Sequence, residues 1–227
     1  MYAAFLIFEG TMTRYVVTRL WSLGAAAAIA ACSSAGGAPP ETQPPASDPI
    51  TRADSVRNSY VAADVGFMTD MIHHHAQALT MARMAPSHGA SGEIQVLAER
   101  IIVGQNDEIA IMQRWLRDQG QPVPDPAAGA PHGGGHAMHM PGMLTQEQLA
   151  ELDAAHGADF DRLFLTYMIQ HHQGALTMVE QLFGTYGAAQ GDMVFKIASD
   201  IGADQTSEID RMRSMLRDML FEDTGSR

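Results

Sequence analysis

The chain has 227 residues, of which 46% are hydrophobic, and this is enough for one domain with a sizeable core or for two small ones. Its 26 acidic residues outnumber its 14 basic residues, which gives a formal charge of −12 and excludes the basic surface that nucleic-acid binding needs. Methionine and histidine are frequent, at 16 and 10 residues. Thioethers and imidazoles serve either as core-filling groups or as metal ligands, and composition alone does not decide between these roles.

The N-terminal residues predict export. Two arginines precede an apolar run over 20–31 that is too short for a comfortable membrane span and fits a signal peptide. The run ends in Ile-Ala-Ala-Cys, which resembles the lipobox of a bacterial lipoprotein and implies lipidation of Cys32. The alternative is an ordinary secretory signal in which Cys32 is incidental. In either case we expect the protein in the periplasm or anchored at an outer membrane surface, and we leave open whether Met1 or Met12 is the true start.

The expected signal peptide covers residues 1–32, and a tether and a first helical hairpin follow it. Residues 33–58 are rich in Ser, Ala, Gly and Pro near their start and are expected to form a flexible tether. From about Tyr60 the apolar residues recur at a 3–4 spacing, which predicts a helix that ends in the Gly-containing segment 85–92. A second helix is expected to end at Gly120, where Pro residues follow. These segments make a hairpin over 59–120.

A linker and a second hairpin complete the chain. Residues 121–144 contain Pro, Gly, His and Met and predict a linker. Thr145 begins a Thr-Gln-Glu-Gln capping box, which predicts a short helix that His-Gly at 156–157 interrupts. Two long helices are then expected, from about 159 to 183 and from about 193 to 220. The second hairpin covers 145–222, and the sequence shows no convincing strand pattern.

The two hairpins are copies of one another. Residues 64–81 align without gaps on 161–178, and residues 105–118 match 205–218. A single hairpin cannot bury its own apolar face. The repeat therefore predicts an all-α fold, with one four-helix bundle over 59–222 built from two hairpins rather than two separate domains.

Each copy carries a Met-x-x-His-His cluster. In a helix, Met71, His74 and His75 lie at i, i+3 and i+4 and project from one side, and Met81 lies two turns beyond His74. The second copy has the same residue types at Met168, His171, His172 and Met178. Pairing the two hairpins should bring up to four imidazoles and several thioethers to one place.

Copper is the ion that this set of donors favours. Imidazole binds copper, zinc, nickel and iron, whereas thioether prefers Cu(I). Zinc and iron are less favoured, because the chain has neither the Glu-x-x-His motifs of di-iron bundles nor a His-Glu-x-x-His motif. Other candidates, as ligands or as groups that orient ligands, are His73, Met112, Met212, Glu108 and Glu208. The alternative is a core in which the histidine pairs bond across the bundle and the methionines only fill space.

The linker carries a second group of donors. They are His132, His136, Met138, His139 and Met140. A Gly-rich segment can wrap an ion without prior structure, although a His-rich tract is only a compositional signal. The alternative is a plain spacer.

Four further residues are assigned structural roles or none. Asp64 and Asp161 lie near helix starts, where a negative charge favours the helix dipole. His88 and His156 sit at helix breaks, and we give them no special role.

The motif Met-Ile-x-His-His followed by Ala and Met, at 71–81 and 168–178, resembles the DUF305 family of bacterial, mostly exported proteins. The resemblance covers roughly residues 60–220 and implies a ferritin-like four-helix fold. Some family members are implicated in copper binding and periplasmic copper tolerance, so the resemblance adds weight to copper. Iron oxidation does not carry over, because "ferritin-like" describes shape alone. One departure is Gln77, which stands where the second copy has Gly174 and should alter how closely the helices approach.

These observations together predict an exported protein that binds and buffers copper in the cell envelope. Its expected partners are the metal ion and, through Cys32, a membrane. One alternative is a metal-dependent oxidase of Cu(I) or another small ion, although the sequence offers no catalytic residues. Another is an envelope interaction module that binds no metal. The sequence leaves open the number of ions, their redox state and whether the chain forms a homo-oligomer.

Overall fold

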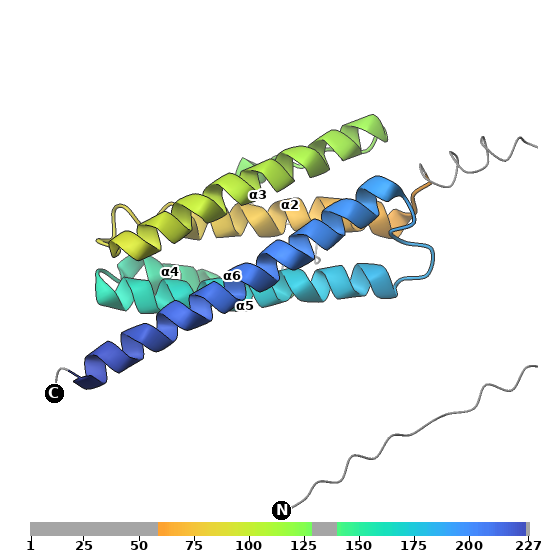
Figure 1. The fold of residues 1–227 in the computed structure, drawn as a ribbon. Coiled ribbons are helices and arrows are strands. Elements are labelled where there is room, and N and C mark those ends of the chain that lie inside the picture. Colours follow the sequence, from red (N-terminus) through yellow and green to blue (C-terminus); the bar gives the residue numbers. More distant parts are fainter. Residues whose placement is uncertain (1–58, 129–139, 226–227) are drawn as a thin grey trace, which may run out of the picture. The chain divides into compact units, whose positions relative to one another are not determined.

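The computed structural model describes residues 59–128 and 140–225 (Figure 1). The expected signal peptide, the lipidation site Cys32, the tether up to residue 58 and linker positions 129–139 lie outside the described residues. The described part is entirely helical and contains no strand, which confirms the predicted all-α fold.

Four long helices form two hairpins that pack on each other. The first hairpin pairs α2 (Ala62–Ala82) with α3 (Gly92–Asp118), and the second pairs α5 (Ala158–Gly184) with α6 (Asp192–Gly225). The hairpins meet mainly through α2 against α5, and α3 also contacts α6. Two shorter elements lie between the hairpins in sequence: the 3₁₀ helix η1 (Pro126–Ala128) contacts α2, and α4 (Gln146–Ala154) contacts α5.

Local sequence signals explain where these helices begin and end. Thr145 caps α4 by accepting a hydrogen bond from the Gln148 amide at 3.2 Å, while the Gln148 side chain accepts one from the Thr145 amide at 3.0 Å, as the predicted capping box requires. Gly157, with φ +58°, allows the chain to turn from α4 into α5. Gly120, with φ +64°, terminates α3 where the sequence predicts.

Two apolar clusters fill the core on either side of the repeated histidines. One cluster joins the first half of α2, including Phe67, to the end of α5, including Leu182. The other joins the end of α2, including Ala82, to the start of α5, including Phe160. The two histidine pairs interrupt this apolar packing near the middle of both helices.

Two buried aspartates fasten each hairpin to the loop of the other. The Asp64 side chain of α2 accepts a hydrogen bond from the Ala189 amide at 2.7 Å, in the α5–α6 loop. Asp161 of α5 accepts bonds from the Ser91 amide at 3.1 and 3.2 Å, in the α2–α3 loop. The expected structural role is therefore larger than an interaction with the helix dipole, because these bonds connect the two halves of the bundle.

None of the helices within the described ranges is long and apolar enough to cross a membrane.

Candidate metal centre

Four fully buried imidazoles meet where α2 and α5 pack together. His74 and His75 come from α2, and His171 and His172 come from α5. The rings of His74 and His171 face each other across the two helices, with centroids 3.9 Å apart and planes inclined at 39°. The structure thus brings together the two histidine pairs that the repeat predicts should meet.

Each outer imidazole is held by a glutamate of the partner helix in its own hairpin. The Nε2 atom of His75 lies 2.7 Å from Oε2 of Glu108 in α3, and Nε2 of His172 lies 2.7 Å from Oε2 of Glu208 in α6. A carboxylate accepts the Nε2 proton, so the lone pair of each ring is on Nδ1. Both Nδ1 atoms are buried and have no hydrogen-bond partner. This is the arrangement in which a carboxylate orients a metal-binding histidine.

His74 is held instead by the end of the linker, residues 140–144, which we call the strap. Nε2 of His74 donates to the Pro141 carbonyl at 3.0 Å. Because a carbonyl oxygen only accepts hydrogen bonds, Nε2 carries the proton and Nδ1 keeps a lone pair. That Nδ1 atom is buried and unpaired as well.

Two positions that differ between the copies explain how the strap reaches His74. A Cβ atom at Gly174 would lie 1.9 Å from the Pro141 oxygen, so any larger residue there would displace the strap. At the equivalent position of α2, Gln77 holds the strap, because its Oε1 accepts from the Leu144 amide at 2.7 Å and its Nε2 donates to the Leu144 carbonyl at 3.0 Å. The strap passes close to Gly174 and bonds to Gln77, so the two copies need different residues here.

His171 is the most isolated of the four imidazoles. Neither of its ring nitrogens makes a hydrogen bond of acceptable geometry, although the nearby His74 backbone weakly favours the charged ring. Burial, followed by the neighbouring imidazoles, holds the pKa of His171 well below its ordinary value. The same causes lower the pKa of His74 to about 3. Both rings are therefore neutral at physiological pH and able to donate a lone pair to a metal.

The repeated methionines lie on both sides of the imidazoles. Met71, Met81 and Met168 are fully buried and Met178 is nearly so. One apolar cluster contains Met71, Met112 and Met178, and the other contains Met81, Met168 and Met212. Each cluster thus takes methionines from both hairpins, as the internal repeat requires.

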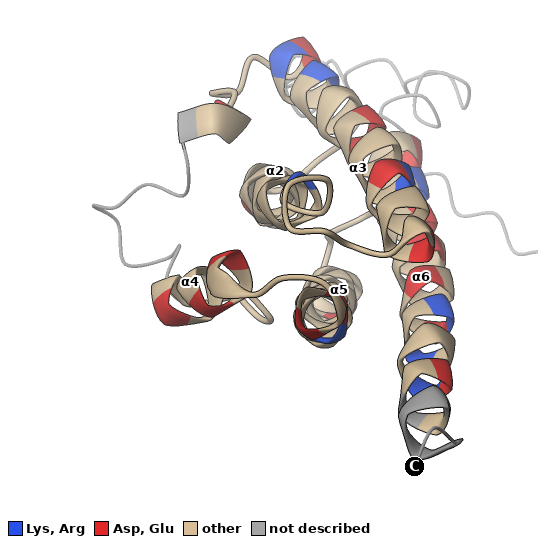
Figure 2. Cartoon of the chain, turned by 90° about the vertical axis from the view of Figure 1, so that its left-hand side faces the viewer, with Lys and Arg blue, Asp and Glu red and all other residues tan. Residues whose placement is uncertain are grey.

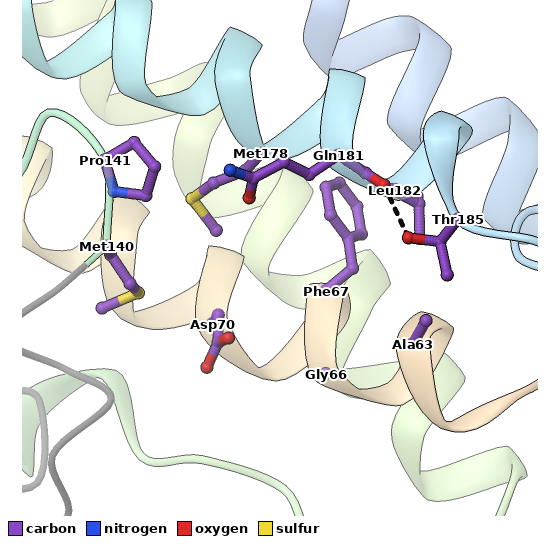
Figure 3. Close-up of a pocket in the computed structure, with 10 residues that line it drawn as sticks. All are labelled: Ala63, Gly66, Phe67, Asp70, Met140, Pro141, Met178, Gln181, Leu182 and Thr185. Atoms are coloured by element: carbon purple, nitrogen blue, oxygen red, sulfur yellow. Dashed lines mark hydrogen bonds between the residues drawn. The ribbon is translucent and has the colours of Figure 1, made fainter.

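A pocket of about 330 Å³ brings the surface close to this centre (Figure 3). It lies between α2 and α5 and is lined by Asp70, Met140, Pro141 and Met178, among others. Figure 3 shows that the thioethers of Met178 and of Met140, which is part of the strap, line this pocket. Of the five predicted linker donors, Met140 is described, whereas His132, His136, Met138 and His139 lie outside the described residues.

The remaining candidate, His73, lies at the edge of the centre. Its side chain is partly buried and its Nδ1 atom is unpaired. Burial lowers the pKa of His73, and Asp70 opposes this shift. Among the described residues, no three His, Cys, Asp or Glu side chains are already grouped as ligands of a single ion.

Sequence reasoning missed the roles of two residues, one at the centre and one in the surrounding fold. The first is Pro141, whose backbone carbonyl orients His74 and which no side-chain motif indicates. The second is His88, which connects the α2–α3 loop to α4 through contacts with the carbonyls of Met84 at 2.8 Å and Asp153 at 2.9 Å. The position of His88 at a helix break was the available signal, and its role is structural.

Comparison with known proteins identifies the family of this chain. The family model described as "Domain of unknown function (DUF305)" matches residues 64–216. A DUF305 fragment from Deinococcus radiodurans is 30% identical, with a TM-score of 0.59, and the match covers 69% of this chain and 97% of that one. A DUF305 protein from Streptomyces coelicolor, assigned as secreted, is 26% identical, with a TM-score of 0.60 and coverage of 69% and 93%.

CopM is a third similar structure. In its Cu(II)-bound form CopM is 32% identical, with a TM-score of 0.55, and the match covers 68% of this chain and 96% of CopM. CopM has also been solved bound to Cu(I) and to silver. Comparison with curated protein sequences finds no match. The match over most of the helical bundle shows that this chain belongs to the DUF305 family.

Proposed function

We propose that this protein binds copper, with Cu(I) as the favoured form, and buffers it in the cell envelope after export. The proposed ligands are the imidazoles and thioethers of the two repeated clusters: His74, His75, His171, His172, Met71, Met81, Met168 and Met178. The proposal also assigns orienting roles to Glu108 and Glu208, which hold His75 and His172.

The observation that carries the proposal is the set of unpaired nitrogens at the α2–α5 contact. In the four fully buried imidazoles, five ring nitrogens have no hydrogen-bond partner: Nδ1 of His74, His75 and His172, and both nitrogens of His171. Buried polar atoms are nearly always paired, because an unpaired one costs about 1–3 kcal/mol. Packing alone would favour apolar residues at these positions. Each neutral imidazole has one ring nitrogen with a free lone pair, and a metal ion would give that lone pair a partner.

The neighbouring sulfurs support copper over other ions. Thioether is a soft ligand that suits Cu(I), whereas zinc and iron sites in helical bundles normally include thiolates or several carboxylates. CopM supports the same assignment, because structures of CopM contain Cu(I), Cu(II) and silver. Silver, like Cu(I), is a soft monovalent ion. The pocket in Figure 3 adds two more thioethers, those of Met140 and Met178, next to Pro141, whose carbonyl holds His74.

Export is the second part of the proposal. The apolar run before Cys32 and its lipobox-like ending support a lipid-anchored protein, and the Streptomyces relative is assigned as secreted. Thiols tend to oxidise outside the cytoplasm, so thioethers and imidazoles are suitable copper ligands there. Labelling cells with a radioactive fatty acid would test the anchor, because Cys32→Ala should abolish incorporation.

Anaerobic Cu(I) titration against a competing chelator tests the metal site. We expect the wild-type chain to retain copper tightly, and the His74→Leu/His171→Leu variant to lose at least roughly a hundredfold in affinity, equivalent to about 3 kcal/mol. The matched control is His73→Gln, which introduces the residue that the second copy has at position 170 and should change affinity less than roughly threefold. Unchanged affinity in a folded double variant, checked by circular dichroism, would rule out the proposed ligands.

A further inference from the structure

A second pocket lies on the other side of the glutamates, between α3 and α6. Its volume is about 210 Å³, and its lining includes two pairs of equivalent residues from the repeat: Gln105 with Gln205, and Glu108 with Glu208. Asp204 also lines it. Figure 2 shows acidic residues along both α3 and α6. The repeat thus brings four oxygen-bearing side chains to one hollow, two from each hairpin.

Both glutamines are buried, and in each the amide oxygen has no hydrogen-bond partner. Gln105 is 2% exposed, and neither its amide oxygen nor its amide nitrogen makes a hydrogen bond. Gln205 is 1% exposed, and its amide oxygen is unpaired as well. A buried polar atom without a partner destabilises a fold, yet the glutamine occurs in both copies. Two such oxygens at one hollow indicate a ligand rather than a packing role.

The carboxylates of the pocket supply charge as well as oxygen atoms. Oε2 of Glu108 holds His75, whereas its Oε1 atom is buried and unpaired. Burial raises the pKa of Asp204, and the carboxylates of Glu108 and Glu208 raise it further, so these three groups are close enough to repel one another. Among the residues that line the pocket, Arg100 is the only one with a positive charge. A bound cation would relieve this repulsion.

We propose that the α3–α6 pocket is a second cation site, which takes a hard divalent ion and fits Ca²⁺ best. Carboxylate and amide oxygens suit Ca²⁺, Mg²⁺ and Mn²⁺, and no imidazole or thioether lines the pocket to attract copper. Ca²⁺ accepts amide oxygens and irregular geometry, whereas Mg²⁺ needs a near-ideal octahedron and retains its waters. The amide oxygens and water must complete the shell, because in the described part of the chain no three acidic or histidine side chains already surround one point.

This site is independent of the copper proposal, although the two share a wall. Glu108 contacts His75 through Oε2 and also lines the pocket, while its Oε1 atom is buried and unpaired. An ion in the pocket would therefore be separated from His75 by a single carboxylate. The two sites use different donors, so the ligands of one site can be substituted while those of the other are kept.

Calorimetric titration of the copper-free full chain with Ca²⁺ tests the site, with Mn²⁺ as a paramagnetic probe that Ca²⁺ should displace. We expect one ion to bind with a dissociation constant of about 0.1–1 mM, in the range of extracellular calcium modules. Asp204→Asn should weaken binding roughly tenfold. Asp210→Asn is the matched control, because Asp210 is on the same helix and is paired with Arg213 outside the pocket. That variant should bind like the wild type.

A double variant, Gln105→Leu/Gln205→Leu, separates a cation site from a water-filled hollow. It should be at least as resistant to heat as the wild type without calcium and should lose the Ca²⁺-induced rise in melting temperature. Absence of saturable binding up to about 10 mM Ca²⁺, or equal binding by the wild type and the Asp204→Asn variant, would overturn the proposal. Copper affinity measured in parallel should be unchanged in Asp204→Asn, so failure of one proposal does not affect the other.

Discussion

His171 shows most clearly that the centre of this bundle is not optimised for packing. Its imidazole is fully buried and has no hydrogen-bond partner for either nitrogen, in contrast to His75 and His172, which are held by glutamates. Such a residue lowers stability where an apolar side chain would fit, which supports the proposed binding role of this position.

Replacing His171 by Leu should therefore make the metal-free protein more stable. The substitution removes two unpaired polar atoms and keeps a similar volume, so we expect the free energy of unfolding to rise by about 1–2 kcal/mol. Urea denaturation of the metal-free chain would measure this. His75→Leu is the contrasting variant, because it leaves Glu108 buried without its partner and should be destabilising by a similar amount. A marked loss of stability in His171→Leu would contradict the view that this ring lacks partners.

The buried imidazoles also predict how stability depends on pH. An unfolded chain protonates His74 near pH 6.5, whereas native His74 takes a proton only near its pKa of about 3. The stability of the metal-free protein should be highest above pH 6.5 and should fall as the pH drops toward 3. At pH 4.5 the difference in pKa lowers the free energy of unfolding by about 3 kcal/mol for His74 alone. Between pH 7 and pH 4.5 the His74→Leu variant should lose less free energy of unfolding than the wild type, by this amount. Denaturation at both pH values measures this, and an equal loss in the two proteins would refute the explanation.

At the scale of elements, periodicity and capping predict the helices well. The expected helix over 159–183 is observed at Ala158–Gly184, and the capping box at Thr145 begins α4 as expected. The strap and the bonds of Asp64 and Asp161 to the loops of the other hairpin were not predictable, because each depends on backbone groups of a distant loop. Sequence repeats reveal which residues are equivalent, and they do not show which loop will cross them.

The strap should be sensitive to a single methyl group. Gly174→Ala places a Cβ atom on the Pro141 carbonyl, so the strap must move and His74 must lose its hydrogen bond. We expect a loss of about 1–3 kcal/mol in the free energy of unfolding. Gly66→Ala is the control, because Gly66 lies inside α2, the new Cβ meets nothing within 4 Å beyond the adjoining backbone of its own helix, and the variant should gain about 0.5–1 kcal/mol. Thermal melts of both variants test this prediction, and equal shifts in melting temperature would mean that the strap is not constrained by Gly174.

The hydrogen bonds between the buried aspartates and the loops of the other hairpin lead to a separate prediction. Asp64→Asn leaves one acceptor oxygen for two amides, those of Val61 and Ala189, so one buried bond is lost. The expected cost is about 1–3 kcal/mol. Asp159→Asn is the control, because its exposed pair with Arg162 should contribute less than about 1 kcal/mol. Urea denaturation should separate the two variants, and hydrogen exchange in the α5–α6 loop should increase only for Asp64→Asn.

At the scale of the whole molecule, the internal repeat explains both the fold and the centre. Each hairpin contributes methionines to both apolar clusters and one histidine pair to the layer between them. Neither hairpin alone encloses the imidazoles, so the centre exists only when both are assembled. The family resemblance and the four-helix fold were predictable for this reason, because a repeated buried motif has few other arrangements.

The remaining question at this scale is whether the linker or the bundle holds copper more tightly. The strap belongs to the bundle, so only the linker donors His132, His136, Met138 and His139 should be changed, all to Ser, with Met140 kept. Because the helical donors are preorganised by packing and by Glu108 and Glu208, they should retain the tightest copper, whereas the total copper bound should fall. Equilibrium dialysis at several chelator concentrations measures both quantities. Loss of the tight site in this variant would make the linker the principal copper ligand and leave the buried histidines without a role in binding.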